Sequence, residues 1–145
     1  MKDYKLAAIL QFCKERNLST KLSSSTSIPY KLLNINNTPI YARFANTPET
    51  LSKGLMGVTQ LQENEGCLLD FGYNTYASLW MKNCKINMQT AMIEPSGIIT
   101  EIIDMSTSDP TRLHRSAQIV RYALEMSEDF FVNHHIKVGH QVKLL

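Results

Sequence analysis

Hydrophobic residues follow two different spacings along this chain, and each spacing predicts a different kind of element. Near the start, Leu6, Ile9, Leu10 and Cys13 recur every three or four residues, which predicts an amphipathic helix over residues 3–17. From residue 30 onwards, short apolar or alternating runs bounded by turn-forming residues predict β-strands. These runs cover residues 40–45, 67–71, 79–83, 90–94, 98–103, 119–126 and 140–145.

Turn signals separate the predicted strands. Pro95-Ser96-Gly97 predicts a tight turn that joins strands 90–94 and 98–103 into a hairpin. Gly139 is expected to turn the chain into its last strand. Residues 105–116 are polar and contain Asp109-Pro110, so they are predicted to form the longest loop.

Two short helices are predicted within the strand-rich region. Thr47-Pro48-Glu49 supplies an N-cap, a proline at the first helical position and an acidic first turn, and the helix should stop at Gly54 or Gly57. Ser127-Glu128-Asp129 predicts the start of a second helix that runs to about His134.

A segment rich in serine and threonine divides the chain in two. Seven of the nine residues at 19–27 are Ser or Thr, which favour turns over regular structure. We therefore expect an N-terminal arm over residues 1–29, with the predicted helix on a linker, and one domain over residues 30–145. The domain is predicted to be α+β and β-rich, with a small barrel-like or sandwich-like mixed sheet and short helices.

Charge separates the arm from the domain. The chain has 145 residues and a formal net charge of +2, and its first 25 residues carry five cations and two anions. The remaining 120 residues carry ten cations and eleven anions, so the domain is close to neutral. Recognition of nucleic acid usually needs a basic face, and the sequence gives little support for such a partner.

Cysteine and histidine spacing argues against a disulfide framework or a metal site. Cys13, Cys67 and Cys84 are widely spaced with no CxxC pair, which is typical of thiols in a reducing compartment. The four histidines match no zinc spacing, and we expect neither a metal nor another cofactor. The apolar run at residues 6–10 is too short for a membrane span or a signal peptide, so an intracellular location, cytoplasmic or within an assembled particle, is expected.

Four sequence blocks together resemble a known family. The blocks are residues 47–56 (TPETLSKGLM), residues 65–71 (EGCLLDF), residues 79–83 (LWMKN), and residues 122–126 (YALEM) with the later IKVG at 136–139. In this order and spacing, over about residues 38–145, they are similar to the uncharacterised family known as domain of unknown function 192. The resemblance implies a compact β-rich domain that is closed or nearly closed into a barrel, and it implies no activity.

Several positions depart from the family pattern. Cys84 stands where the family usually has Thr, and Met88-Gln89 stands where a Leu-Asp pair is usual. A usual glycine is missing from residues 126–129, and His140 replaces the usual Asp. Because Gln89 is not an acid, a catalytic or metal-binding role for a carboxylate at that position is excluded here.

The LWMKN block carries the main candidate for a ligand site. If residues 79–83 form a strand, Trp80 and Lys82 share one face, and an aromatic ring beside an ammonium group suits a small anionic or cyclic ligand. Asn83, Gln89 and Glu125 are included as candidate ligand-binding residues. A structural alternative remains open, in which Trp80 is a core or rim residue that Lys82 passes on its way to solvent. Glu125 is expected to form an ion pair with Lys82 across the sheet.

Three functional hypotheses follow. The first is a non-catalytic binding or interaction module, for a small ligand or a protein partner, with its site around Trp80. The second is a structural or accessory subunit of a larger assembly, such as a viral particle or a homo-oligomer, attached through Leu6, Ile9, Leu10 and Cys13 of the arm. The third is a hydrolase that acts on a small or carbohydrate-like substrate through Lys82, Asn83 and Glu125, and no catalytic motif supports it.

The second hypothesis predicts that the arm and the domain are separable. Deletion of residues 1–28 should abolish incorporation into the assembly and leave the domain folded, because the linker carries no strand of the predicted sheet. Co-purification of the assembly with the full chain and with the deleted chain measures this. Normal incorporation of the deleted chain, folded by circular dichroism, would remove the hypothesis.

Overall fold

The computed structural model describes residues 29–145. The predicted N-terminal helix and its linker, including the candidate partner-binding residues of the arm, lie outside the described residues. Within the part described, no helix is long and apolar enough to cross a membrane. The elements are β1 (Tyr30–Ile35), β2 (Thr38–Ala45), α2 (Pro48–Lys53), β3 (Glu65–Thr75), β4 (Ser78–Leu79), β5 (Met88–Ile93), β6 (Ile99–Met105), β7 (His114–Arg115), β8 (Val120–Ser127), α3 (Phe130–Asn133) and β9 (Val142–Leu144).

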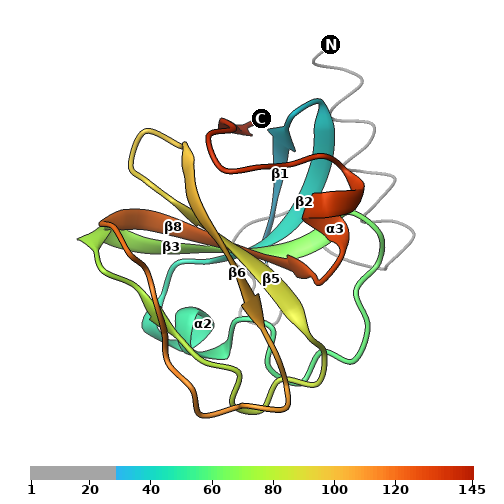
Figure 1. The fold of residues 1–145 in the computed structure, drawn as a ribbon, viewed down its shortest axis with the longest axis vertical. Helices are drawn as coiled ribbons and strands as arrows, with labels where there is room; N and C mark the ends of the chain where they lie inside the picture. Colours follow the sequence, from blue (N-terminus) through green and yellow to red (C-terminus); the bar gives the residue numbers. More distant parts are fainter. Residues whose placement is uncertain (1–28) are drawn as a thin grey trace.

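Seven strands form one curled, mixed sheet in the order β6-β5-β8-β3-β2-β1-β9 (Figure 1). The β2–β3 pair is parallel, and α2 lies in the crossover between its strands. The other neighbouring pairs are antiparallel. A bridge between Ile98 and Gln141 joins the two edges of the sheet at one end, where the Val142 amide donates to the Gly97 carbonyl at 2.8 Å. The predicted β-rich fold with a barrel-like mixed sheet is therefore confirmed, as a half-barrel.

Local sequence signals account for several of these elements. The turn at Pro95-Ser96-Gly97 joins β5 and β6 into the predicted hairpin. Thr47 caps α2 in a reciprocal capping box with Thr50, and Gly54 ends the helix with φ of +47°. The second predicted helix is present as α3, which is shorter than expected because Ser127 still belongs to β8.

The strand β1 was not among the predicted strands. It pairs with β2 through a two-residue turn at Asn36 and Asn37, whose φ angles are +50° and +61°. Two successive left-handed residues are typical of the type I′ hairpin turn, which asparagine adopts more readily than most residues. The pair of asparagines is therefore the sequence signal for this hairpin.

The predicted strand over residues 79–83 is wrong beyond its first residue. The β4 strand ends at Leu79, and it pairs with β7 inside the segment that was predicted to be a loop. Met81 is fully buried, and the chain then turns at Lys82 and Asn83, where the φ angle of Asn83 is +62°. Trp80 and Lys82 are therefore not neighbours on the face of a strand.

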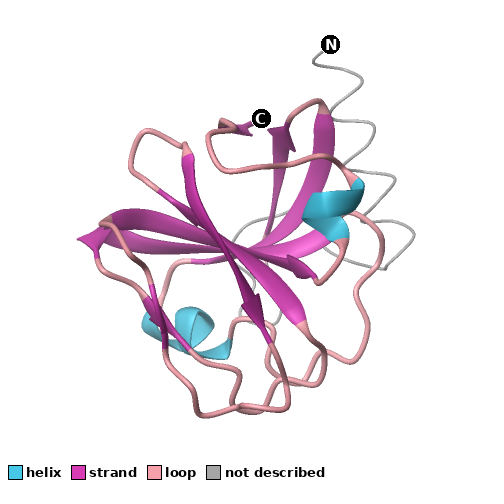
Figure 2. Ribbon diagram, in the orientation of Figure 1, coloured by secondary structure: helices cyan, strands magenta, loops and turns pink. Residues whose placement is uncertain are grey.

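The sheet carries a hydrophobic core on each face. The α3-side core includes Phe131, Leu68 and Leu124, and the α2-side core includes Cys67 and Leu69 from the same strand β3. The alternation follows from the period of two along a strand. Figure 2 shows the two short helices on opposite sides of the sheet. The α2-side core is rich in methionine, with Met81, Met88, Met92 and Met105 all buried.

Close contact between β3 and β8 predicts a large penalty for a side chain at Gly66. A Cβ atom there would overlap Met126 Sδ and lie 2.5 Å from the Glu125 carbonyl oxygen. We expect Gly66→Ala to lower the free energy of unfolding by about 2–3 kcal/mol, through overpacking of the core. Urea unfolding followed by circular dichroism measures the loss.

Gly72 in the same strand provides the matched control. It has φ of +80° and open space where a Cβ would stand, so Gly72→Ala should cost only the backbone strain of about 1–2 kcal/mol. If Gly66→Ala lowers the free energy of unfolding no more than Ser52→Ala, a substitution at an exposed position, the close contact between β3 and β8 is contradicted.

Candidate functional site

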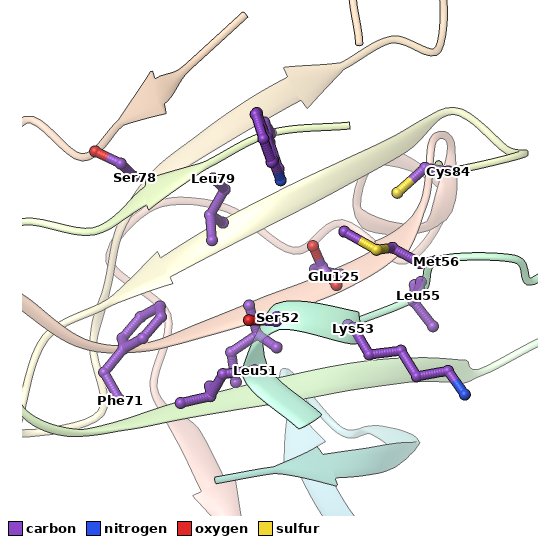
Figure 3. A pocket seen from close by; sticks show the side chains of 13 residues that line it. Leu51, Ser52, Lys53, Leu55, Met56, Phe71, Ser78, Leu79, Cys84 and Glu125 are labelled. Atoms are coloured by element: carbon purple, nitrogen blue, oxygen red, sulfur yellow. The ribbon is translucent and has the colours of Figure 1, made fainter. Parts of the chain in front are cut away.

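A cavity of about 300 Å³ opens on the α2 side of the sheet (Figure 3). Its walls come from α2 and the loop that follows it, from β3, and from β4 with the loop that follows β4. The lining residues are Leu51, Ser52, Lys53, Gly54, Leu55, Met56, Leu69, Phe71, Ser78, Leu79, Trp80, Cys84 and Glu125. Most of these side chains are apolar, and Glu125 is the one carboxylate among them.

Glu125 is presented to the cavity by β8, a central strand of the sheet. It lies opposite Cys67 of β3 on one side and opposite Thr90 of β5 on the other. The side chain is only 6 % exposed, and its Oε1 atom has no hydrogen-bond partner. Figure 3 shows its carboxyl group in the middle of the lining side chains. A buried polar atom without a partner is rare in folded proteins, so this oxygen requires an explanation.

Burial changes the ionisation of Glu125. Loss of solvation disfavours the charged form and raises the pKa of this carboxyl to about 7. The expected ion pair with Lys82 is wrong, because no salt bridge joins the two residues in the described part of the chain. Without that cation to stabilise the carboxylate, the carboxyl group is partly protonated near neutral pH.

Gly54 packs directly over the Oε1 atom of this carboxyl group and helps to bury it. A Cβ atom at Gly54 would lie 3.0 Å from Glu125 Oε1, which is tighter than ordinary van der Waals contact. The residue also ends α2 with a positive φ, a conformation that favours glycine. The sequence predicts that this helix stops at Gly54 or Gly57. The end of α2 agrees with that prediction, and the contact with Glu125 was missed because it joins segments 71 residues apart.

Two cysteines lie close to Glu125 and remain protonated near neutral pH. The pKa of the half-buried Cys84 is raised by burial and then by the negative charge of Glu125. Burial raises the pKa of Cys67 above the usual range, with a further increase from Glu125 and an opposing effect of Arg43. Since the thiolate is the reactive form of cysteine, neither residue is poised as a nucleophile.

Trp80 forms part of the cavity rim and is 42 % exposed. The Lys82 ammonium lies 5.2 Å from the centroid of its ring, a distance suited to a cation–π interaction. Lys82 is therefore engaged with Trp80 and does not reach Glu125. Asn83 is exposed in the turn, where its carbonyl accepts a hydrogen bond from the Gly57 amide at 3.0 Å.

Gln89 lies apart from the other candidate residues. Thr90 pairs with Glu125 and shares its face of the sheet, so Gln89, one residue earlier, faces the opposite side. Its Nε2 donates to Asp104 Oδ1 at 2.7 Å on the neighbouring strand β6. The structure thus brings Trp80 and Glu125 to one cavity. The Lys82 ammonium lies against the Trp80 ring, and Gln89 and Asn83 do not line the cavity.

The histidines are not brought together. His134 stacks on Phe130 with 4.4 Å between ring centroids, and His140 Nδ1 accepts from the Lys137 amide. His114 is buried beside β4, where desolvation lowers its pKa. Among residues 29–145, no group of three or more His, Cys, Asp or Glu side chains is placed to hold a metal ion.

The buried carboxyl of Glu125 predicts a specific pH dependence of stability. Folding raises its pKa from 4.5 to about 7, so the folded state binds this proton more tightly than the unfolded state. The group therefore favours folding at low pH, and that contribution is lost as pH rises from about 4.5 to about 7. Relative to Glu125→Gln, the free energy of unfolding of the natural protein should fall by about 2 kcal/mol between pH 5 and pH 8.

Urea unfolding at several pH values measures this difference. Glu128→Gln removes the same charge at an exposed position and should follow the natural protein at every pH. A parallel pH profile for the natural protein and Glu125→Gln would show that the carboxyl titrates normally.

Comparison with known proteins identifies relatives by fold. No protein of curated function matches the chain. A crystal structure described as a candidate transcription regulator from Sinorhizobium meliloti 1021 superposes with a TM-score of 0.79 at 21 % identity, over 83 % of this chain and 98 % of that one. A protein of unknown function from Novosphingobium aromaticivorans DSM 12444 gives 0.74 at 21 % identity, over 85 % and 91 %. At this identity, the similarity shows the fold alone.

The family profile of domain of unknown function 192, described as an uncharacterised ACR, matches residues 31–144. The match confirms the resemblance carried by the four sequence blocks. The match begins at residue 31, whereas the resemblance began at about residue 38. It therefore covers all of the hairpin of β1 and β2 except Tyr30. The chain therefore belongs to the family of domain of unknown function 192.

Proposed function

We propose that this domain is a non-catalytic binding module for a small molecule, which occupies the cavity over Glu125 and beside Trp80. The observation that carries this proposal is the Glu125 carboxyl group, which lines an open cavity and whose buried Oε1 atom has no hydrogen-bond partner. Burial of an unsatisfied carboxyl group is unfavourable, and a ligand that donates a hydrogen bond to it removes that penalty.

The remainder of the cavity fits a small, partly apolar ligand. Leucine, methionine and phenylalanine side chains form much of its walls, and Trp80 adds an aromatic surface at the rim. Ser52, Lys53, Ser78 and Glu125 also line the cavity, so polar and apolar surface contribute to it about equally. Small-molecule sites range from about 300 to 1,000 Å³ in volume. The volume of this cavity is at the lower end of that range.

The polar residues required by a hydrolase are not assembled around Glu125. The ammonium group of Lys82 is engaged with the ring of Trp80, and the Asn83 side chain is exposed in a turn. Both nearby thiols have raised pKa values. These contacts support binding over catalysis as the role of the cavity.

Native mass spectrometry of the protein, purified from its own source, tests the proposal. We expect a non-covalent small-molecule adduct that is lost in a denatured sample. The same preparation of Trp80→Ala should retain less than about one-fifth of the adduct, because loss of an aromatic contact that contributes about 1 kcal/mol or more lowers the affinity at least about fivefold.

Tyr73→Ala provides the matched control for this substitution. Tyr73 is also an exposed aromatic residue, at 66 %, and it does not line the cavity. Its variant should retain the adduct at the natural level. Equal adduct in Trp80→Ala and the natural protein, or bare subunits in every sample, would count against a ligand in this cavity.

A further inference from the structure

The chemistry around Glu125 also restricts what kind of ligand the cavity accepts, provided that the proposed function is correct. We infer that the ligand is a small organic ammonium ion, whose N–H group binds the Glu125 carboxylate while its hydrocarbon part lies against the apolar walls and Trp80. Three observations on the structure support this class: the single carboxylate, the hydrocarbon side chains beside it and the placement of the nearby lysines.

Glu125 supplies one acceptor group with one unit of charge. When ionised it can only accept hydrogen bonds, and its Oε1 atom accepts none from the protein. A cationic donor that binds this carboxylate compensates its buried charge, and charge-assisted hydrogen bonds of this kind are about twice as strong as neutral ones. A neutral donor would bind the carboxylate without compensating the charge.

The surroundings of the carboxyl group favour an organic cation over a hydrated inorganic one. Leu55 and Leu69 are almost completely buried beside the cavity, and Phe71 extends its apolar wall. These groups cannot replace the oxygen ligands that a hydrated metal ion requires, whereas they pack well against hydrocarbon. The Trp80 ring adds an aromatic surface at the rim, against which the hydrocarbon part of the ligand can lie.

The charged and titratable groups near Glu125 leave the site open to a cation. Cys67 on β3 and Cys84 on the loop after β4 are neutral thiols, and β5 presents Thr90, which does not titrate. Lys53 of α2 lines the cavity, but Figure 3 shows its ammonium group directed away from Glu125. The ammonium of Lys82 is held on the Trp80 ring. No cation of the described chain therefore occupies the position that the ligand would take.

Matched fragment trios test this inference. Each trio places an amine, an alcohol and a carboxylate on the same hydrocarbon group, with cyclohexylmethyl, benzyl and n-pentyl as the three groups. Binding to the full chain is measured from amide chemical shifts in a nitrogen-15 correlation spectrum. At pH 8 we expect amines to bind at least tenfold more tightly than alcohols of the same trio, with shifts at the amides of residues 54 and 125. Carboxylates should not bind.

The pH dependence of amine affinity tests whether ionisation of Glu125 controls binding. The amines remain protonated throughout, so their affinity should rise about tenfold between pH 6 and pH 8 as Glu125, with a pKa of about 7, ionises. The alcohols should show no such rise. Glu125→Gln should abolish the preference for amines, and Glu128→Gln, which removes the same charge at an exposed position, should preserve it. The spectrum of each variant also reports whether it is folded.

Each outcome of this experiment has a definite meaning. Alcohols or carboxylates that bind in the cavity as tightly as amines would overturn the ammonium assignment and leave the proposed binding function standing. A folded Glu125→Gln variant that still prefers amines would also overturn the ammonium assignment and leave the proposed binding function standing. Absence of binding by every fragment, together with no adduct from the natural source, would overturn both.

A lysine side chain carries the same ammonium group, and a blocked lysine, Nα-acetyl-lysine methylamide, distinguishes this source. Tighter binding of the free amines than of the blocked lysine supports a small molecule. Tighter binding of the blocked lysine would overturn that assignment in favour of a lysine side chain of a partner.

Discussion

The pairing of β8 between β3 and β5 is the interaction on which the rest of this structure depends. Both ladders are antiparallel, and their registers place Glu125 opposite Cys67 and Thr90. A shift of one residue in either ladder would move Glu125 to the α3-side core, among Phe131, Leu68 and Leu124. The hydrogen bonds of the central strand therefore determine which core receives the carboxyl group and where the cavity can form.

The elements on the α2 side enclose this carboxyl without satisfying it. The turn that ends α2 places a glycine over the oxygen atoms, and the chain after β4 adds Trp80 and Cys84. A longer side chain from either segment could have donated a hydrogen bond to Glu125, as Arg43 and Tyr30 contact the buried Glu65 elsewhere in the sheet. The two buried glutamates differ in their surroundings: Glu65 has protein partners, whereas Glu125 has an oxygen without a partner and lines an open cavity. That contrast separates a structural carboxylate from a candidate binding group.

The sequence predicts the local features of this fold more successfully than the site. The capped helix at Thr47 and the hairpin at Pro95-Ser96-Gly97 depend on backbone preferences of a few adjacent residues, and both are present. The strand expected over residues 79–83 fails because Asn83 adopts a left-handed turn conformation, which the apolar pattern does not reveal. Burial of Glu125 depends on packing between segments far apart in the chain, so no local pattern could show that its oxygen lacks a partner or that Lys82 binds an aromatic ring instead.

The methionines of the α2-side core give the cavity a property that its outline alone does not show. Met56 lines the cavity directly, and Met81, Met88 and Met92 lie in the core behind it. Unbranched thioether side chains change rotamers at little cost and adapt to irregular shapes. A wall built on them can remould around hydrocarbon groups of different outlines, whereas the carboxyl group on a central strand is held in place. The proposed site therefore combines a charge that is fixed in position with walls that adapt in shape, a combination suited to a chemical class of ligands rather than to one compound.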